Sequence, residues 1–140
     1  MNKATLERLR AEARSFPMMF GTGVPDFEIE AAEAALGCEF TEAYVQFLRE
    51  FGGAMVGSEP ILGLRRADVM GVDAWSVVET TRRFRADGWA GADDRYVVSI
   101  DGAGNPIGVG RDGAVYLSDH HGGGLQKVAG DFEQFLSSRL

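Results

Sequence analysis

The fold of this chain is decided by residues 96–117, which read YVVSIDGAGNPIGVGRDGAVYL. The apolar runs in this stretch are short and rich in β-branched residues, as is typical of strands. Turn-forming residues separate them, DGAGNP at 101–106 and RDG at 111–113. An antiparallel meander is therefore expected, with strands over residues 96–100, 107–109 and 114–117.

Glycines are expected to form the turns of this meander. Asp112-Gly113 lies between two apolar runs, and this dipeptide indicates a hairpin with a primed turn, because glycine accepts positive φ freely. Gly102 and Gly104 belong to the preceding turn. They also resemble half of a nucleotide-binding fingerprint, but the third glycine is missing and Pro106 prevents a helix from opening there. A hairpin turn is favoured over a nucleotide site.

The meander is followed by a further short strand, predicted over residues 125–128, and by a terminal helix. Asp131 can cap this helix, because its carboxylate can accept backbone N–H groups of the first turn. Apolar residues recur along the helix at a spacing that places them on one face. They are Phe132, Phe135, Leu136 and Leu140.

The start of the chain predicts a helix over residues 3–14, where Leu6, Leu9 and Ala13 recur at helical spacing. The helix ends before Pro17, since the residue that precedes proline avoids helical angles. The first residues lack the uninterrupted apolar run of a signal peptide, and no stretch is long and apolar enough to span a membrane. A cytoplasmic protein without membrane contact is expected.

A second helix is expected to begin at Pro25, a residue that is favoured in the first turn of helices. Asp26 and Glu28 suit the positive end of the helix dipole. Gly37 follows as a left-handed cap at the C-terminal end. The inner face of this helix is predicted to consist of one aromatic residue and three alanines, Phe27, Ala31, Ala34 and Ala35.

A third helix is predicted to follow Thr41, a good N-cap, and to end at Gly52-Gly53. Its apolar residues form a stripe that should face the core. They are Tyr44, Phe47, Leu48 and Phe51. After this helix, residues 60–64 read as a strand or a strand edge.

A fourth helix is predicted over residues 73–85, with Trp75, Val78 and Phe84 facing inward. Three arginines crowd its end, Arg82, Arg83 and Arg85. Positive charge suits the C-terminal end of a helix, so a solvated end is favoured over a phosphate contact. Trp89 follows, and it is either an exposed aromatic anchor for a partner or a plug of the core under a loop.

The composition indicates one acidic globular domain. The chain has 140 residues, 45% of them hydrophobic, which suffices for one core. Its formal net charge is −7, so non-specific binding of nucleic acid, which needs Lys and Arg against phosphates, is not expected. The single cysteine, Cys38, is predicted to be a small buried or half-buried residue rather than a nucleophile.

Negative charge is concentrated between residues 24 and 50, which contain seven acids and one base and so carry a net charge of −6. Such a face could steer a basic protein partner into contact. The alternative is a solvated helix surface that keeps the protein soluble. The candidate partner contacts are Asp26, Glu28, Glu30, Glu39 and Glu42.

Asp119-His120-His121 contains both histidines of the chain and is the densest cluster of potential metal ligands. Neighbouring residues in a strand point to opposite faces, so a metal site would need further carboxylates from elsewhere in the fold. A polar loop that leads into the glycines at 122–124 is favoured. We therefore expect no metal, no cofactor and no catalytic residue, with a small metal-dependent enzyme at these three residues as the minor alternative.

Four segments carry a family resemblance. They are Ile29-x-x-x-Glu33-x-x-Leu36-Gly37, Tyr44-x-x-Phe47-Leu48-x-x-Phe51-Gly52-Gly53, residues 96–107 followed by Gly113-x-Val115-Tyr116 and Asp119-His120, and Phe132-x-x-Phe135-Leu136. In this order and spacing, over residues 24–138, they resemble the SUKH superfamily. That superfamily includes the Smi/Knr-type cell-wall regulators of yeast and many bacterial immunity proteins.

The resemblance implies an α+β domain in which helices pack on a mostly antiparallel sheet. The whole chain, residues 1–140, is then one domain, with an N-terminal helix and loop at 1–23 and a family-like core at 24–138. The resemblance also implies a non-enzymatic role in binding protein. Because many bacterial relatives neutralise toxins, often nucleases or deaminases, the leading hypothesis is an immunity protein that occludes a basic, nucleic-acid-acting toxin. The alternative is an intracellular regulatory or scaffold domain that binds a host protein.

Overall fold

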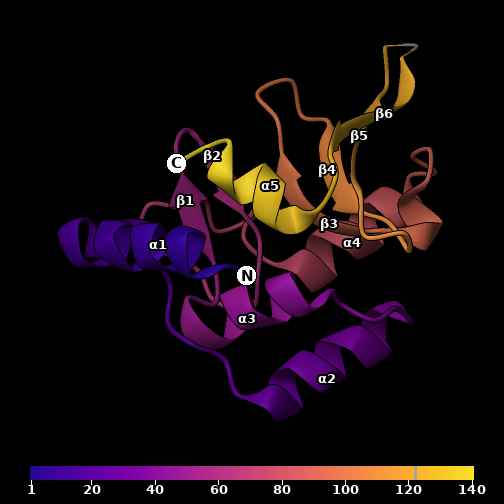
Figure 1. The fold of residues 1–140 in the computed structure, drawn as a ribbon. Coiled ribbons are helices and arrows are strands. Elements are labelled where there is room, and N and C mark those ends of the chain that lie inside the picture. The colour runs from indigo at the N-terminus through magenta and orange to yellow at the C-terminus, as the bar shows by residue number, and fades with distance from the viewer. Residues whose placement is uncertain (122) are drawn as a thin grey trace.

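A four-stranded antiparallel sheet in the order β3-β4-β5-β6 forms one side of the molecule (Figure 1). The structure is a computed structural model that describes residues 1–121 and 123–140. The strands are β3 (Tyr96–Ile100), β4 (Pro106–Val109), β5 (Val115–Asp119) and β6 (Gly124–Ala129). Each strand pairs with the next along the chain. The predicted meander and the further strand are therefore confirmed.

The turns within this meander differ in detail from the prediction. Gly104 and Gly113 take positive φ, 86° and 81°, whereas Gly102 does not. Gly113 donates its N–H to the carbonyl of Gly110 at 3.0 Å, and Asp112 keeps a negative φ. The predicted primed turn is wrong, because both primed types need a positive φ at the first of their two central residues, which here would be Asp112. One left-handed glycine closes the hairpin instead.

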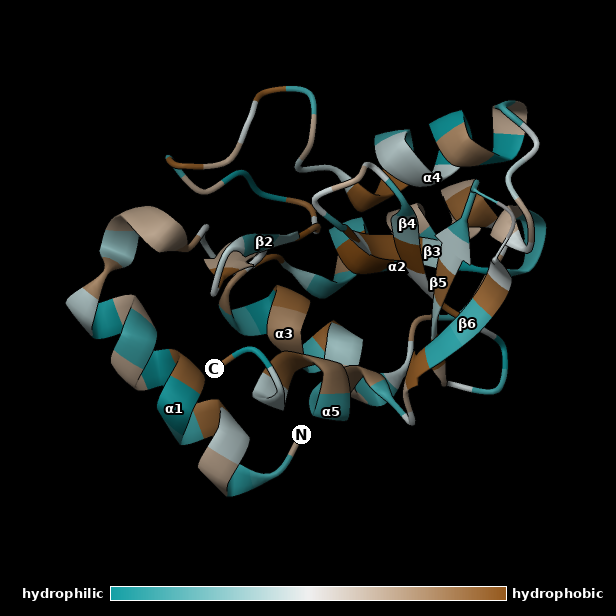
Figure 2. Cartoon of the chain, turned by 90° about the horizontal axis from the view of Figure 1, so that it is seen from above, coloured by the Kyte–Doolittle hydropathy of each residue, from teal (hydrophilic) through white to brown (hydrophobic). Residues whose placement is uncertain are grey.

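The described residues also form a two-stranded antiparallel sheet and a set of helices, so the fold is α+β, as predicted. Figure 1 shows α2 as the lowest layer, and Figure 2, a view from above, shows α1 at the periphery beside α5. The helices are α1 (Lys3–Ser15), α2 (Asp26–Leu36), α3 (Glu42–Glu50), α4 (Val77–Ala86) and α5 (Phe132–Ser137), with short 3-10 turns η1 (Pro17–Met19) and η2 (Ala92–Asp94). The small sheet consists of β1 (Ala54–Val56) and β2 (Glu59–Ile61).

α4 starts four residues later than the predicted helix. Ser76 is its N-cap, since the Ser76 hydroxyl accepts a hydrogen bond at 3.1 Å from a backbone N–H of the first turn. Just before it, the Trp75 carbonyl accepts the N–H of Gly63 at 2.9 Å, which holds this segment outside the helix. Of the side chains predicted to face inward, Phe84 is buried, whereas Trp75 and Val78 are half-buried.

α2 turns towards the core a different face from the one predicted. Its buried side chains are Ile29, Ala32 and Leu36. The predicted inner face is exposed, namely Phe27, Ala31, Ala34 and Ala35. Both sets recur at helical spacing, so spacing alone does not discriminate between them. The rotation is fixed by polar contacts that flank the buried side, made by Glu28 and Glu33.

Tyr44 lies at the centre of the core, and its side chain is fully buried. Its hydroxyl donates a hydrogen bond to the carbonyl of Leu62 at 2.7 Å. Its ring contacts aromatic rings from α3, β3, α5 and the loop before α3, at centre-to-centre distances of 5.1 to 6.2 Å. These are Phe40, Phe47, Tyr96 and Phe132. The predicted apolar stripe of α3 is therefore confirmed.

Gly52 and Gly53 end α3, as predicted, and they also permit a close backbone crossing. Gly52 has a φ of 71°, and its carbonyl accepts the N–H groups of Leu64 and Arg65 at 2.8 and 3.0 Å. A Cβ atom at Gly63 would lie 1.9 Å from the Gly52 carbonyl oxygen, and one at Gly53 would lie 2.2 Å from the Arg65 carbonyl oxygen. Side chains at these positions would push the two segments apart.

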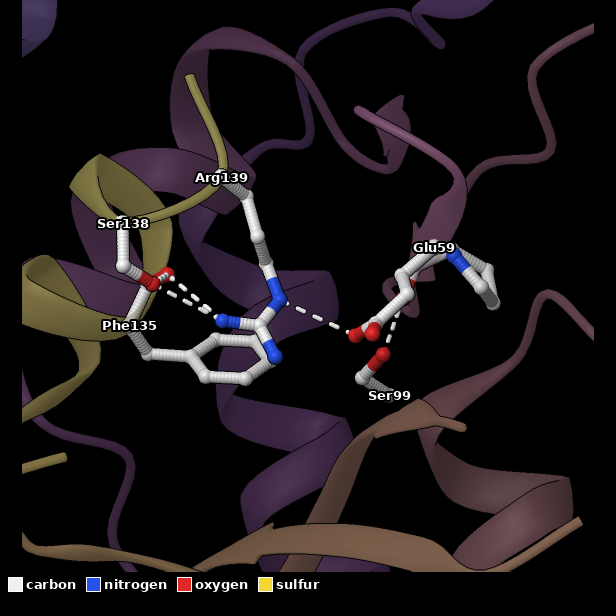
Figure 3. Close-up of polar contacts among 6 residues, drawn as sticks. Glu59, Ser99, Phe135, Ser138 and Arg139 are labelled. Carbon is white, nitrogen blue, oxygen red and sulfur yellow. Dashed lines mark hydrogen bonds and ion pairs between the residues drawn. The ribbon is translucent and has the colours of Figure 1, made fainter. Parts of the chain in front are cut away.

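A group of polar contacts joins the C-terminal end of the chain to β2 (Figure 3). Arg139 Nε donates to Glu59 Oε2 at 2.9 Å, and the guanidinium carbon lies 3.8 Å from the centre of the Phe135 ring. The neighbouring residue of β2, Pro60, accepts a hydrogen bond from the Ser99 hydroxyl at 2.6 Å. The small sheet is thus tied both to the residues that follow α5 and to the large sheet.

Replacing Tyr44 with phenylalanine should lower the free energy of unfolding by about 1–2 kcal/mol, because the Leu62 carbonyl loses a buried donor while the ring remains. Urea denaturation at neutral pH measures this change. Tyr116→Phe is the matched control, since the hydroxyl that it removes bonds to Asp112 at the surface, and it should have a much smaller effect. Equal losses in the two variants would contradict the central role of Tyr44.

Alkaline pH should destabilise the fold through its buried tyrosines. Burial raises the pKa of Tyr96 to about 12, against an ordinary value of about 10 in the unfolded chain. The stabilising contribution of the neutral phenol is therefore complete below about pH 10 and is lost as the pH rises through about 12. Urea denaturation at a series of pH values should show the free energy of unfolding falling over this range. The fall should be shallower in Tyr96→Phe, and an unchanged slope would exclude Tyr96 as its cause.

Candidate protein-binding surface

Two acids of the predicted contact set are paired within the chain. Asp26 Oδ1 accepts a hydrogen bond from Arg49 Nε at 2.7 Å. Glu28 Oε2 accepts one from Arg65 Nη1, also at 2.7 Å. These hydrogen bonds lower the pKa of both carboxyl groups, so both remain ionised at neutral pH. Because their charge is offset locally, they are weaker candidates for a partner contact than the sequence indicates.

Two further acids of the same segment stabilise the fold. Glu50 Oε2 accepts a hydrogen bond from Arg10 Nε at 2.7 Å, which ties α1 to the end of α3. Glu33 Oε2 accepts the N–H of Phe40 at 2.8 Å and so holds the loop between α2 and α3. Sequence spacing gave no sign of these contacts, because their partners lie far apart along the chain or in the backbone.

Three acids of the predicted set remain available. Each is exposed, and none forms an ion pair with any residue that the structure describes. α2 and α3 lie with the start of one beside the end of the other, as the Asp26–Arg49 pair shows. The loop that joins the two helices therefore lies at the opposite end of the pair and contains Glu39, whereas Glu30 is on α2 and Glu42 is the first residue of α3. We call these three acids the α2–α3 acidic surface: Glu30, Glu39 and Glu42.

A hollow of about 340 Å³ lies beside this surface, between the α2–α3 loop and the β4–β5 turn. Arg111 and Asp94 form a long ion pair of 3.7 Å at its edge, and both side chains are exposed. Burial raises the pKa of the Cys38 thiol, which is half-buried, as predicted, and stays protonated at neutral pH. The hollow is lined by Gly37, Cys38, Glu39, Asp94, Tyr96, Val109, Gly110 and Arg111.

Trp89 is half-buried and packs against the end of the large sheet. Its ring meets Phe84 edge-to-face at 5.0 Å and His120 at 5.1 Å. These contacts favour the hypothesis that Trp89 plugs the core under a loop over the hypothesis of an exposed anchor. The contacts found for Trp89 do not include the α2–α3 acidic surface, so we give it no part in that surface.

The histidine pair is engaged in local hydrogen bonds. His120 Nδ1 lies 2.6 Å from Asn105 Oδ1, and the buried Asn105 side chain in turn donates to Asp101 at 3.2 Å. Asp119 accepts the N–H of His121 at 2.9 Å. Across residues 1–121 and 123–140, no three His, Cys, Asp or Glu side chains gather as metal ligands would. The contacts therefore match those of a polar turn.

Arg85 differs from the predicted solvated helix end. Its guanidinium donates to the carbonyls of Leu36, Ala92 and Arg95 at 2.8, 2.9 and 3.2 Å. These bonds tie the end of α2 to α4 and to the segment before β3. Arg82 and Arg83, in contrast, are exposed, as predicted. The sequence does not distinguish Arg85 from Arg82 and Arg83, because local spacing does not reveal which arginine will meet carbonyls of other elements.

Most of the chain matches a known protein family. Among the residues described, no helix combines the length and apolarity needed to cross a membrane. A search of curated proteins gives no match. The sequence profile of the SMI1 / KNR4 family (SUKH-1) matches residues 23–138, which include α2 to α5 and both sheets. The resemblance carried by the four signature segments is thus confirmed, and the chain belongs to the SMI1 / KNR4 family (SUKH-1).

Proposed function

We propose that this chain is a non-enzymatic protein-binding domain that neutralises a toxin by covering the toxin's basic surface. The observation that carries the proposal is the α2–α3 acidic surface, whose three carboxylates are exposed and have no ion pair among the described residues. Membership of the SUKH group supports it, because that group is associated with immunity proteins.

Charge complementarity gives the mechanism. A toxin that acts on nucleic acid needs a basic cleft for the phosphates of its substrate. Carboxylates at the α2–α3 surface can occupy such a cleft, steer the encounter and exclude the substrate. Acids that are already paired with arginines would contribute less, which singles out Glu30, Glu39 and Glu42 within the predicted set.

The side chains that could supply chemistry are used by the fold, which supports binding over catalysis. His120 is hydrogen-bonded to Asn105, and its ring meets that of Trp89 edge-to-face. The Cys38 thiol is protonated at neutral pH, because burial raises its pKa. The neutral phenol of Tyr44 is bonded to the Leu62 carbonyl in the core. None of these groups is presented as a nucleophile or a base.

Capture of the partner tests the proposal. The tagged protein should retain one basic protein from a lysate of its source, and this retention should weaken when salt rises from about 0.1 M to about 1 M, which shortens the screening length from roughly 10 Å to roughly 3 Å. Expression of the captured protein alone should stop growth, and co-expression of this chain should restore it. Capture of a resident protein that does not impair growth would instead favour the regulatory role.

Reversing the acidic surface should weaken the complex selectively. The triple variant Glu30→Lys, Glu39→Lys, Glu42→Lys should slow association with the captured partner at low salt by about tenfold or more and flatten its salt dependence. Stopped-flow kinetics measures both. The control with the same change in net charge is Glu7→Lys, Glu12→Lys, Asp68→Lys, at exposed positions outside α2 and α3. Equal slowing in the two triple variants would show that only net charge matters.

A further inference from the structure

The composition of α2 is unusual for a helix covered on one side. Seven of its eleven residues are apolar and the other four are acidic, so that it contains neither a base nor a neutral polar residue. An amphipathic surface helix has one apolar stripe opposite a polar face. In α2 the apolar residues occur on two sides, and this pattern is typical of a helix that is covered on both.

The residues that the structure describes cover only one of these sides. Ile29, Ala32 and Leu36 face the core, with exposed fractions of 2% to 4%. Phe27 lies on the other side and is 71% exposed, the largest exposed fraction among the large hydrophobic residues described. Figure 1 shows α2 at the lower edge of the molecule, and Figure 2 shows it beneath the sheet. We call the exposed side the outer face of α2: Phe27, Ala31, Ala34 and Ala35.

The outer face has the shape and rigidity that a helix needs for docking. Alanines at one-turn spacing after Phe27 leave a flat track on which a second helix can approach closely. α2 is anchored at its start by the Asp26 and Glu28 ion pairs and at its end by the bond from Arg85 to the Leu36 carbonyl. A partner would therefore meet a pre-ordered surface, which lowers the entropic cost of binding.

Charge identifies the class of occupant. Of the four acids of α2, Asp26 and Glu28 are offset by arginines, whereas Glu30 is exposed, has no ion pair among the described residues and borders the outer face. A second copy of the chain would place acid against acid, which disfavours self-association. A basic segment with one apolar side complements both the charge and the apolar residues.

We propose that the outer face of α2 receives a basic amphipathic helix of the partner. An apolar side chain of that helix packs on Phe27 and the alanine track, and a lysine or arginine beside it pairs with Glu30. This inference rests on the proposed function, in which the partner presents a basic surface, and adds to it the kind of segment that binds and the apolar anchor that receives it.

A synthetic peptide tests the inference with the full chain. The peptide has about 15 residues, leucine on one helical side and lysine on the other, since shorter isolated helices are marginal in water. Backbone amide shifts of the labelled protein should move mainly on α2, and fluorescence titration gives the dissociation constant. Phe27→Ser should weaken binding about tenfold, because a phenylalanine loses its apolar contact. A peptide with glutamate in place of lysine should not bind.

Phe16→Ser is the matched control, since Phe16 is also exposed, at 50%, but follows α1. It should leave the dissociation constant unchanged within about twofold. Ala34→Gln adds volume to the outer face without changing charge, and it should weaken binding as Phe27→Ser does. Circular dichroism of each variant confirms that the fold is retained.

Several results would overturn the inference. They are equal binding by Phe27→Ser and Phe16→Ser, amide shifts centred away from α2, or a dimer in light scattering that Phe27→Ser abolishes. The failure of this inference can be told apart from the failure of the proposed function. If the acidic-surface variant no longer neutralises the captured partner while Phe27→Ser still does, the outer face of α2 is not the anchor and the toxin-neutralising role stands.

Discussion

The buried hydroxyl of Tyr44 is the constraint on which the rest of the fold depends. A phenol in an apolar core must find a partner, and the Tyr44 hydroxyl finds it in the carbonyl of Leu62, at 2.7 Å. That bond fixes the distance between α3 and the segment after β2. The Tyr44 ring meanwhile contacts rings from β3, α5 and the loop before α3, so one side chain sets the relative positions of both sheets and two helices.

The position of the segment after β2 has consequences further along the chain. Gly63 passes so close to the Gly52 carbonyl that it cannot carry a side chain. The backbone bonds made there leave Arg65 pointing towards Glu28 on α2. An interaction in the core thus decides which acids of the helical segment are neutralised. The charge pattern of the surface follows from the packing, and residues that look equivalent in sequence become different in the structure.

The sequence predicted those parts of the fold that depend on local chemistry. The strands of the meander, the stripe on α3 and the caps at Gly37 and Asp131 all follow from spacing and turn preferences. The features of the structure that depend on contacts between distant residues were not predicted. The rotation of α2 was predicted wrongly, because two apolar sets share the same period. The candidate acids were predicted from local charge, but their pairing was not, since Arg49 and Arg65 lie 23 and 37 residues from their partners Asp26 and Glu28.

The spacing of the apolar residues on the outer face of α2 predicts burial, yet within residues 1–121 and 123–140 this face stays exposed. Selection for stability alone would not favour Phe27 at 71% exposure beside a row of alanines, because a polar residue there would cost nothing in the core. The apolar outer face and Glu30, which has no ion pair among the described residues, therefore both fit the proposed partner helix.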